Sequence, residues 1–266
     1  MSPLLPAVET GKGARKRFGQ HFLIDPMVLE EIVACVGHAD DGPVVEIGPG
    51  RGALTERLLA HGFEVHAVEI DRDLVTHLGE RFIGQNRLHL HQGDALHFDL
   101  GTLPIDQSAL RLVGNLPYNI STPLLFRLLE LGGRIGQMCF MVQKEVADRL
   151  VAAPGTGDYG RLAVMTQAFC SAGVALDVPP EAFAPPPRVD SNVVLLRPTP
   201  PPRCGFAALG KLVAEAFLHR RKMLRQTLAK HYPPGTLESL GIPLTARPEN
   251  ITVAQYVALA DVPTLA

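Results

Sequence analysis

The stretch EIGPGRGALT (46–55) joins the end of an apolar run to the start of an amphipathic one. Gly48, Gly50 and Gly52 allow a tight turn there and let a ligand approach the backbone where a Cβ atom would collide. Such a turn is typical of nucleotide sites, and Gly48, Gly50 and Ala53 also satisfy the dinucleotide pattern G-x-G-x-x-G/A. The stretch therefore predicts a βα turn that binds a nucleoside cofactor. It does not decide which cofactor, and a turn without ligand is the alternative.

Around this turn, from Pro43 to about Pro198, short β-branched runs alternate with amphipathic stretches. This alternation predicts an α/β fold, a mostly parallel Rossmann-like sheet covered by helices on both faces. The predicted strands are 44–48, 64–70, 88–94, 111–115, 137–143, 174–180 and 191–197, and the predicted helices are 53–60, 72–82 and 123–131. The last two strands flank a proline-rich loop, so we expect an antiparallel hairpin at the sheet edge.

The prolines of 198–203 interrupt this alternation, and helical spacing follows them. Apolar side chains share one face of a helix predicted over 211–230: Val213, Phe217, Leu224 and Leu228. We therefore expect two domains, with the sheet in 1–200 and a small helical domain in 201–266.

Composition places the chain among soluble globular proteins, because 46% of its 266 residues are hydrophobic and 20% are charged. Its four cysteines are far apart and form no CxxC pair, which predicts neither a zinc site nor a disulfide framework. The first residues do not resemble a secretory signal, and no apolar run approaches the ~18 residues that cross a membrane. We expect a cytoplasmic protein without membrane contact.

The net charge of −2 argues against a protein that binds nucleic acid over its whole surface. A nucleic-acid surface must therefore be local. Two basic groups qualify: Lys12, Arg15, Lys16 and Arg17 near the N-terminus, and Arg220, Arg221, Lys222 and Arg225 near the C-terminus. The alternative for both is a solvated face.

Acidic residues lie at the ends of the next two predicted strands, 64–70 and 88–94. Glu69 lies about 20 residues beyond the glycine turn, where a carboxylate in such folds accepts hydrogen bonds from ribose hydroxyls. That role suits NAD and S-adenosylmethionine equally well. Asp94 ends the following strand and could accept from the adenine amino group of a cofactor, or could simply form a turn beside Gly93.

The fourth predicted strand ends in Asn115-Leu116-Pro117-Tyr118, and this motif favours S-adenosylmethionine. The lone pair of an exocyclic amino group is delocalised into its ring. If the Asn115 oxygen and a neighbouring backbone carbonyl accept both amino hydrogens, the lone pair becomes available for attack. Pro117 stiffens the turn, and Tyr118 can stack on the base and hold it in line. The motif thus predicts methyl transfer to an adenine amino group, with an ordinary strand-ending turn as the alternative.

With these motifs in order, the sequence resembles the bacterial 16S ribosomal RNA dimethyladenosine transferases from about Lys12 through the helical tail. The motifs that carry the resemblance are KRFGQHFL (16–23), EIGPGRGALT (46–55), VEID (68–71), GDAL (93–96), GNLPYNISTPLL (114–125) and FAPPPRVDSNVV (183–194). The family's fold is a Rossmann-like class I methyltransferase domain followed by a helical domain. The resemblance implies a cofactor site formed by His21, Leu23, Gly48, Gly50, Glu69, Asp94 and Asn115. It also suggests that Phe183 closes the target pocket opposite Tyr118.

The same resemblance implies a substrate and a partner. The substrate would be two adjacent adenosines near the 3′ end of 16S ribosomal RNA, each methylated twice at N6 with S-adenosylmethionine. The partner would be the immature small ribosomal subunit, in whose biogenesis the protein would take part. We expect a monomer that needs no metal and docks RNA through Arg220, Arg221, Lys222 and Arg225.

Three rival hypotheses stay open at this point. An enzyme of the same fold could methylate a large-subunit adenine and confer macrolide resistance, since both groups share NLPY-type motifs. A ribosome-assembly factor could act mainly by binding. An NAD-dependent oxidoreductase is disfavoured, because no hydride-transfer acid such as a Tyr-Lys pair is found beside the NLPY motif.

Overall fold

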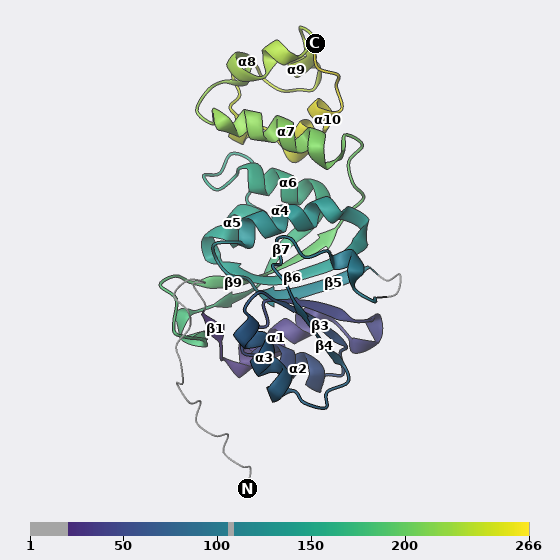
Figure 1. Cartoon of the computed structure of the whole chain (residues 1–266). Helices are drawn as coiled ribbons and strands as arrows, with labels where there is room; N and C mark the ends of the chain where they lie inside the picture. Colours follow the sequence, from purple (N-terminus) through teal and green to yellow (C-terminus); the bar gives the residue numbers. More distant parts are fainter. Residues whose placement is uncertain (1–20, 106–108, 266) are drawn as a thin grey trace.

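The computed structural model describes residues 21–105 and 109–265, and it is built around a seven-stranded sheet (Figure 1). In spatial order the strands are β4 (Leu88–Gln92), β3 (Val65–Glu69), β2 (Val44–Ile47), β5 (Leu110–Asn115), β6 (Ile135–Gln143), β9 (Ser191–Pro198) and β7 (Cys170–Val178). The first five run parallel, and β9 is antiparallel to both of its neighbours. The predicted edge hairpin is confirmed, with β7 as the outer strand, and β7 begins four residues earlier than the predicted run 174–180.

Helices cover both faces of the sheet, as the alternation predicts (Figure 1). The first group comprises α1 (Pro26–Val36), α2 (Ala53–Ala60) and α3 (Arg72–Arg81), and the second comprises α4 (Ser121–Leu131), α5 (Lys144–Val151) and α6 (Arg161–Phe169). Successive side chains of a strand point to opposite faces of the sheet. Val44 therefore packs into the core beneath α1 and α2, whereas Val45 packs into the core beneath α4 to α6.

Helix α1 was not among the predicted elements, although its sequence has clear start signals. The Asp25 side chain caps the helix by accepting from the backbone N–H groups of Met27 and Val28, and Pro26 occupies the first helical turn. The buried residues recur at helical spacing: Val28, Leu29, Ile32, Val33 and Val36. The helix therefore packs an apolar stripe onto the sheet.

The turn between β2 and α2 has the backbone that its glycines permit. Gly48, Gly50 and Gly52 have φ values of 67°, 57° and 82°, a region that side chains with a Cβ rarely adopt. At Gly52, a Cβ atom would lie 2.7 Å from side-chain atoms of Leu78 and Phe82. This turn therefore needs glycine for conformation and for the close packing of α3.

A two-stranded sheet brings two distant segments together beside the main sheet. Strand β1 (Phe22–Leu23) pairs antiparallel with β8 (Phe183–Ala184), so that Leu23 lies opposite Phe183. The loop between β7 and β9 is thereby attached to the segment that precedes α1.

The C-terminal part is helical and begins where the proline-rich stretch ends (Figure 1). Its helices are α7 (Gly205–Leu218), α8 (Leu224–Thr227), α9 (Thr236–Ser239) and α10 (Val253–Ala260). The short 3-10 helices of the described chain are η2 (Ala39–Asp41), η3 (Leu100–Thr102), η4 (Gly132–Arg134), η5 (Pro180–Ala182), η6 (Ala229–His231) and η7 (Pro248–Asn250). The predicted single helix over 211–230 is wrong, because the chain turns between Leu218 and Leu224.

The helical tail packs directly on α6 and extends the core beneath α4 to α6. Met165 of α6, Val213 of α7 and Tyr256 of α10 are buried in one continuous apolar cluster. The Tyr159 hydroxyl also donates to the carbonyl of Ile251, at 2.8 Å. The boundary at about 200 is therefore a change of architecture without a break in the core. None of the helices in the described part of the chain has the length and apolar character required to cross a bilayer.

Candidate active site

A cavity of about 740 Å³ opens at the carboxyl ends of β2, β3, β4 and β5. Ligands of open α/β sheets bind at this edge. With one exception, the residues predicted for the site line the cavity: His21, Leu23, Gly48, Gly50, Glu69, Asp94, Asn115, Leu116, Pro117 and Tyr118. The fold thus brings together four strand ends and the segment before α1.

Glu69 is the last residue of β3 and is 4% exposed. One oxygen accepts from the Gly50 N–H at 3.2 Å and the other from the Asp71 N–H at 2.9 Å. Burial raises the pKa of Glu69, and these backbone hydrogen bonds partly oppose that shift. Each oxygen keeps a lone pair that can accept a further hydrogen bond, which suits a diol.

Asp94 follows β4, and the turn-forming role is the one visible in its contacts. One carboxylate oxygen accepts from the Leu96 N–H at 2.9 Å, and the other lies 3.0 Å from His97 Nδ1. Burial alone would raise the pKa of Asp94, but these hydrogen bonds outweigh it and the pKa is lowered. Asp94 is therefore a fixed anion at the rim of the cavity.

The Asn115 side chain is oriented by the segment before α1. Its Nδ2 atom donates to the carbonyl oxygen of His21 at 2.9 Å. Because that carbonyl can only accept, the amide nitrogen must face it. The Oδ1 atom has no hydrogen-bond partner among the residues that the structure describes, so it is available as an acceptor in the cavity.

The next residue supplies a second acceptor. The Leu116 N–H donates to the carbonyl of Met141 at 3.0 Å, which fixes this peptide to β6, and Pro117 has no N–H to offer. Within residues 21–105 and 109–265, the Leu116 carbonyl accepts no hydrogen bond. Asn115 and Leu116 therefore hold two acceptors that can take the two hydrogens of a primary amine.

Tyr118 follows Asn115 and Leu116 closely in the chain and lines the same cavity. The ring stacks on His21, with centroids 5.7 Å apart and planes 25° apart. Its hydroxyl lies 2.8 Å from Ser191 Oγ. Burial raises the pKa of Tyr118, so the phenol stays neutral near pH 7. The side chain offers a flat, uncharged surface rather than a base.

Phe183 is the exception among the predicted pocket residues. It is 3% exposed and packs in the core beneath α1 and α2, while its neighbour Ala184 lines the cavity. A stacking role for Phe183 opposite Tyr118 would require this ring to leave the core. In the present structure the aromatic residue near Gly50 is Phe22, whose ring atoms lie 3.1 Å from a Cβ built there.

Glu46 is a cavity residue that sequence reasoning missed. It is 1% exposed and accepts a 2.6 Å hydrogen bond from the Thr55 hydroxyl. Burial raises the pKa of Glu46 to about 7, Thr55 partly opposes the shift, and Glu69 adds to it. The available signal was a carboxylate inside the apolar run VVEI, which is rare unless the group has a partner.

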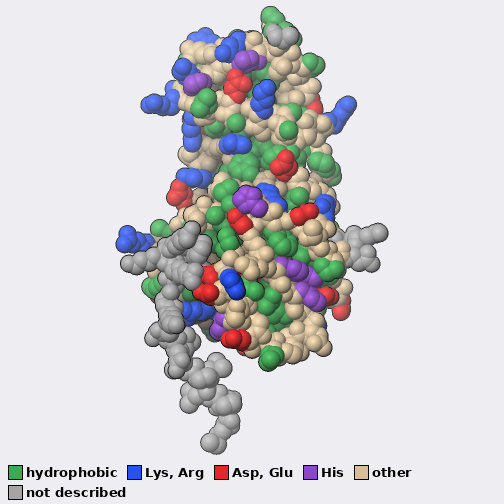
Figure 2. Space-filling view, viewed as in Figure 1, with side chains coloured by type: hydrophobic (Ala, Val, Ile, Leu, Met, Phe, Trp, Pro, Cys, Tyr) green, Lys and Arg blue, Asp and Glu red, His purple; other side chains and the backbone are tan. Residues whose placement is uncertain are grey.

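The four basic residues predicted to dock RNA in the tail differ in their contacts. Arg220 is engaged inside the protein, because Nε donates to Glu249 at 2.8 Å and a terminal nitrogen donates to the Gly157 carbonyl at 2.6 Å. Arg221, Lys222 and Arg225 are exposed. Several basic side chains lie on the face of the helical tail that Figure 2 shows. The second predicted group, Lys12, Arg15, Lys16 and Arg17, lies outside the described residues.

Sequence comparisons agree with this geometry. The family model for ribosomal RNA adenine dimethylases matches residues 11–264. A relative from Pseudomonas fluorescens, named ribosomal RNA small subunit methyltransferase A, is 48% identical over 251 residues, which is 93% of each chain. A relative of the same name from Shewanella oneidensis is 49% identical over 257 residues, which is 96% of each chain.

Solved structures give the same result. A dimethyladenosine transferase from Plasmodium falciparum has a TM-score of 0.76 and 26% identity over 90% of this chain and 96% of its own. The 23S rRNA methyltransferase ErmE has a TM-score of 0.70 and 28% identity over 90% of this chain and 98% of its own. With a matching family model, close relatives and a methyltransferase fold, the chain belongs to the ribosomal RNA adenine dimethylase family.

Proposed function

We propose that this chain transfers methyl groups from S-adenosylmethionine to N6 of two adjacent adenosines near the 3′ end of 16S ribosomal RNA, in the assembling small subunit. The observation that carries the proposal is the pair of acceptors at Asn115 and Leu116. The His21 carbonyl fixes the Asn115 amide so that Oδ1 and the Leu116 carbonyl can accept both hydrogens of one amino group.

The cavity fits the cofactor at several points. Its volume of about 740 Å³ can hold a nucleoside with an amino-acid chain. Glu69 would accept from the ribose hydroxyls, Asp94 would lie near the adenine, and the turn at Gly48 and Gly50 would let the cofactor approach the backbone. The bound cofactor supplies an electrophilic methyl group on a sulfonium.

The residues of the chain act by positioning the target. Tyr118 stacks on the base, and the two acceptors orient the amino nitrogen so that its lone pair can attack. When the nitrogen gains the methyl group, one N–H becomes acidic and water can take that proton. Tyr118 stays protonated near pH 7 and is not required as a base.

The small subunit is favoured as the source of the RNA by the sequence relatives. Those at 48% and 49% identity carry small-subunit names, whereas the large-subunit enzyme ErmE is 28% identical. Incubating the protein with radiolabelled S-adenosylmethionine and either immature small subunits or large subunits tests this directly.

Mapping the label should locate it on two adjacent adenosines near the 3′ end of the small-subunit RNA. Label found in large-subunit RNA instead would support the rival substrate. A catalytically inactive variant that fully restored subunit maturation would favour the binding-factor hypothesis over methylation as the main role.

A further inference from the structure

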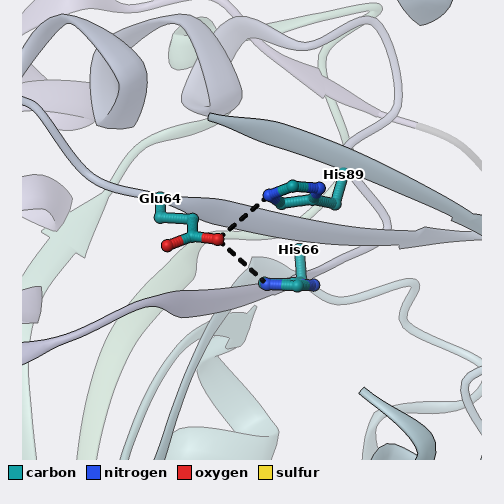
Figure 3. A group of neighbouring side chains, drawn as sticks. All are labelled: Glu64, His66 and His89. Atoms are coloured by element: carbon teal, nitrogen blue, oxygen red, sulfur yellow. Dashed lines mark hydrogen bonds and ion pairs between the residues drawn. The ribbon is translucent and has the colours of Figure 1, made fainter. Parts of the chain in front are cut away.

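Two histidines and a glutamate converge at the start of β3, the opposite end of that strand from Glu69. His66 lies directly beside His89 in the parallel pairing of β3 with β4. Glu64 precedes His66 by two residues, so its side chain projects from the same face of the sheet. Figure 3 shows the three side chains pointing toward one another.

The three groups are close enough to share one ion. One nitrogen or oxygen atom from each lies within 4.8 Å of the others. Glu64 Oε1 is 3.0 Å from His89 Nε2 and 3.7 Å from His66 Nε2. The side chains of Glu64 and His89 are 50% and 40% exposed, so they can adjust around an ion held by the buried His66.

His66 provides an independent sign that this cluster binds a ligand. Its side chain is 1% exposed, and Nε2 is buried without a hydrogen-bond partner in the described part of the chain. Leaving such an atom unpaired costs free energy. His66 Nδ1 lies 3.1 Å from His91 Nε2. If Nδ1 donates its proton to His91, the lone pair of Nε2 faces the Glu64 carboxylate, an arrangement that a cation would stabilise.

We propose that Glu64, His66 and His89 bind a divalent first-row transition metal ion, for which zinc is the best match. Two imidazole nitrogens and one carboxylate oxygen are a zinc ligand set, with water completing a tetrahedron. His91 orients His66 from behind, as outer hydrogen-bond partners of metal-bound histidines do. The ion fastens the edge strand β4 to β3, and it lies away from the acceptors at Asn115 and Leu116.

The test uses the full chain without a histidine tag. Calorimetric titration of the metal-stripped protein with Zn²⁺ should give about one bound ion per chain. Glu64→Gln and His89→Gln should each abolish that binding, because each removes a ligand of the ion. Both side chains are half-exposed, so the variants should fold. His77→Gln removes an exposed histidine of α3 and should bind as the parent protein does.

A second measurement separates this site from the free cysteines. Bound Co²⁺ should show d–d absorption without the charge-transfer bands of a cobalt–thiolate bond. His91→Phe should weaken binding about 10- to 100-fold, the usual effect of removing an outer partner of a ligand. Binding that survives His89→Gln, or a thiolate signature in the Co²⁺ spectrum, would overturn the proposal.

Discussion

The Asn115 side-chain nitrogen donates to the His21 carbonyl, and we propose that its oxygen accepts a hydrogen bond from the substrate amino group. Asn115→Ala removes the oxygen, and we expect single-turnover methylation to fall by roughly 10²- to 10³-fold, the usual loss for one transition-state partner. Affinities for cofactor and RNA, measured in parallel, should change much less. Methylation within about twofold of wild type under saturating conditions would contradict the role proposed for Asn115.

The ring of Tyr118 and its hydroxyl make different contributions. Tyr118→Ala should weaken engagement of the target base by about 1–3 kcal/mol, because the stacking surface is removed. Tyr118→Phe keeps the stacking surface but leaves Ser191 without its 2.8 Å partner. We therefore expect near-normal methylation and a loss of about 1 kcal/mol in unfolding free energy. A severe methylation defect in Tyr118→Phe would indicate proton transfer instead.

Glu46 should make the stability of the protein depend on pH. Its pKa is about 7 in the folded protein, against 4.5 for the ordinary group, so the folded state holds the proton more tightly. The associated stabilisation is complete below about pH 4.5 and is lost as the pH rises through 7. Ionisation of Glu46 should therefore lower the unfolding free energy at pH 8 by at most about 3 kcal/mol relative to pH 4.5.

Urea denaturation of the protein and of Glu46→Gln across this pH range measures the effect. Glu69 and other groups titrate in both proteins, so the difference between the two curves isolates Glu46. The stability of Glu46→Gln should fall less between pH 4.5 and pH 8. Parallel curves for the two proteins would show that folding does not raise the pKa of Glu46.

Among the elements, the turn that begins α2 should be sensitive to a single added methyl group. Gly52 and Gly84 both have a φ of 82°, but only at Gly52 would a Cβ collide, at 2.7 Å from Leu78 and Phe82. Gly84→Ala should cost about 1–2 kcal/mol for the backbone alone. Gly52→Ala should cost about 1–3 kcal/mol more, because it overpacks the contact with α3. If Gly52→Ala and Gly84→Ala lose equal unfolding free energy in thermal or urea denaturation, the predicted collision with Leu78 and Phe82 is wrong.

The sheet and the strand-end residues could be predicted because their patterns are local. Helix α2 has its predicted bounds, and the predicted strands 64–70 and 111–115 differ from β3 and β5 by at most one residue at either end. Parallel strands place their carboxyl ends at one edge, so the residues there share a cavity. Helices α1, α5 and α6 were missed although α1 has a proline and a capping aspartate at its start.

Other features depend on contacts between distant segments. The spacing of Phe217 and Leu224 continues a helical pattern across the real break, so periodicity could not reveal the turn between them. Contacts across the tail fix it: the Leu224 N–H donates to the Ala246 carbonyl, and Arg220 binds Glu249. The burial of Phe183 likewise follows from the pairing of β8 with β1, which no local pattern shows.

At the scale of the whole molecule, the exposed basic residues of the tail are the candidate RNA-docking surface. The side chains of Arg221 and Lys222 are exposed and open to phosphate. Replacing both with Glu should weaken binding to immature subunits, and the log–log salt slope should fall by about one for each phosphate that is no longer neutralised. Cofactor affinity should not change.

A control for charge alone is Arg72→Glu, an exposed residue on α3 near the other end of the molecule. This variant should bind subunits with little change in salt slope. If the Arg221 and Lys222 double variant keeps wild-type affinity and slope, these side chains are only solvated. The docking surface would then be sought at Lys12 to Arg17.

The continuous core and the Arg220 contacts join the tail firmly to the sheet domain. The proposed docking surface and the candidate active site therefore lie at a fixed distance from each other. Under the proposed docking, an RNA held by the tail would meet the pocket only if its adenosines lay at that distance. Substrate choice would then be a measurement of length, and an RNA with the right sequence but the wrong span would be bound and left unmodified.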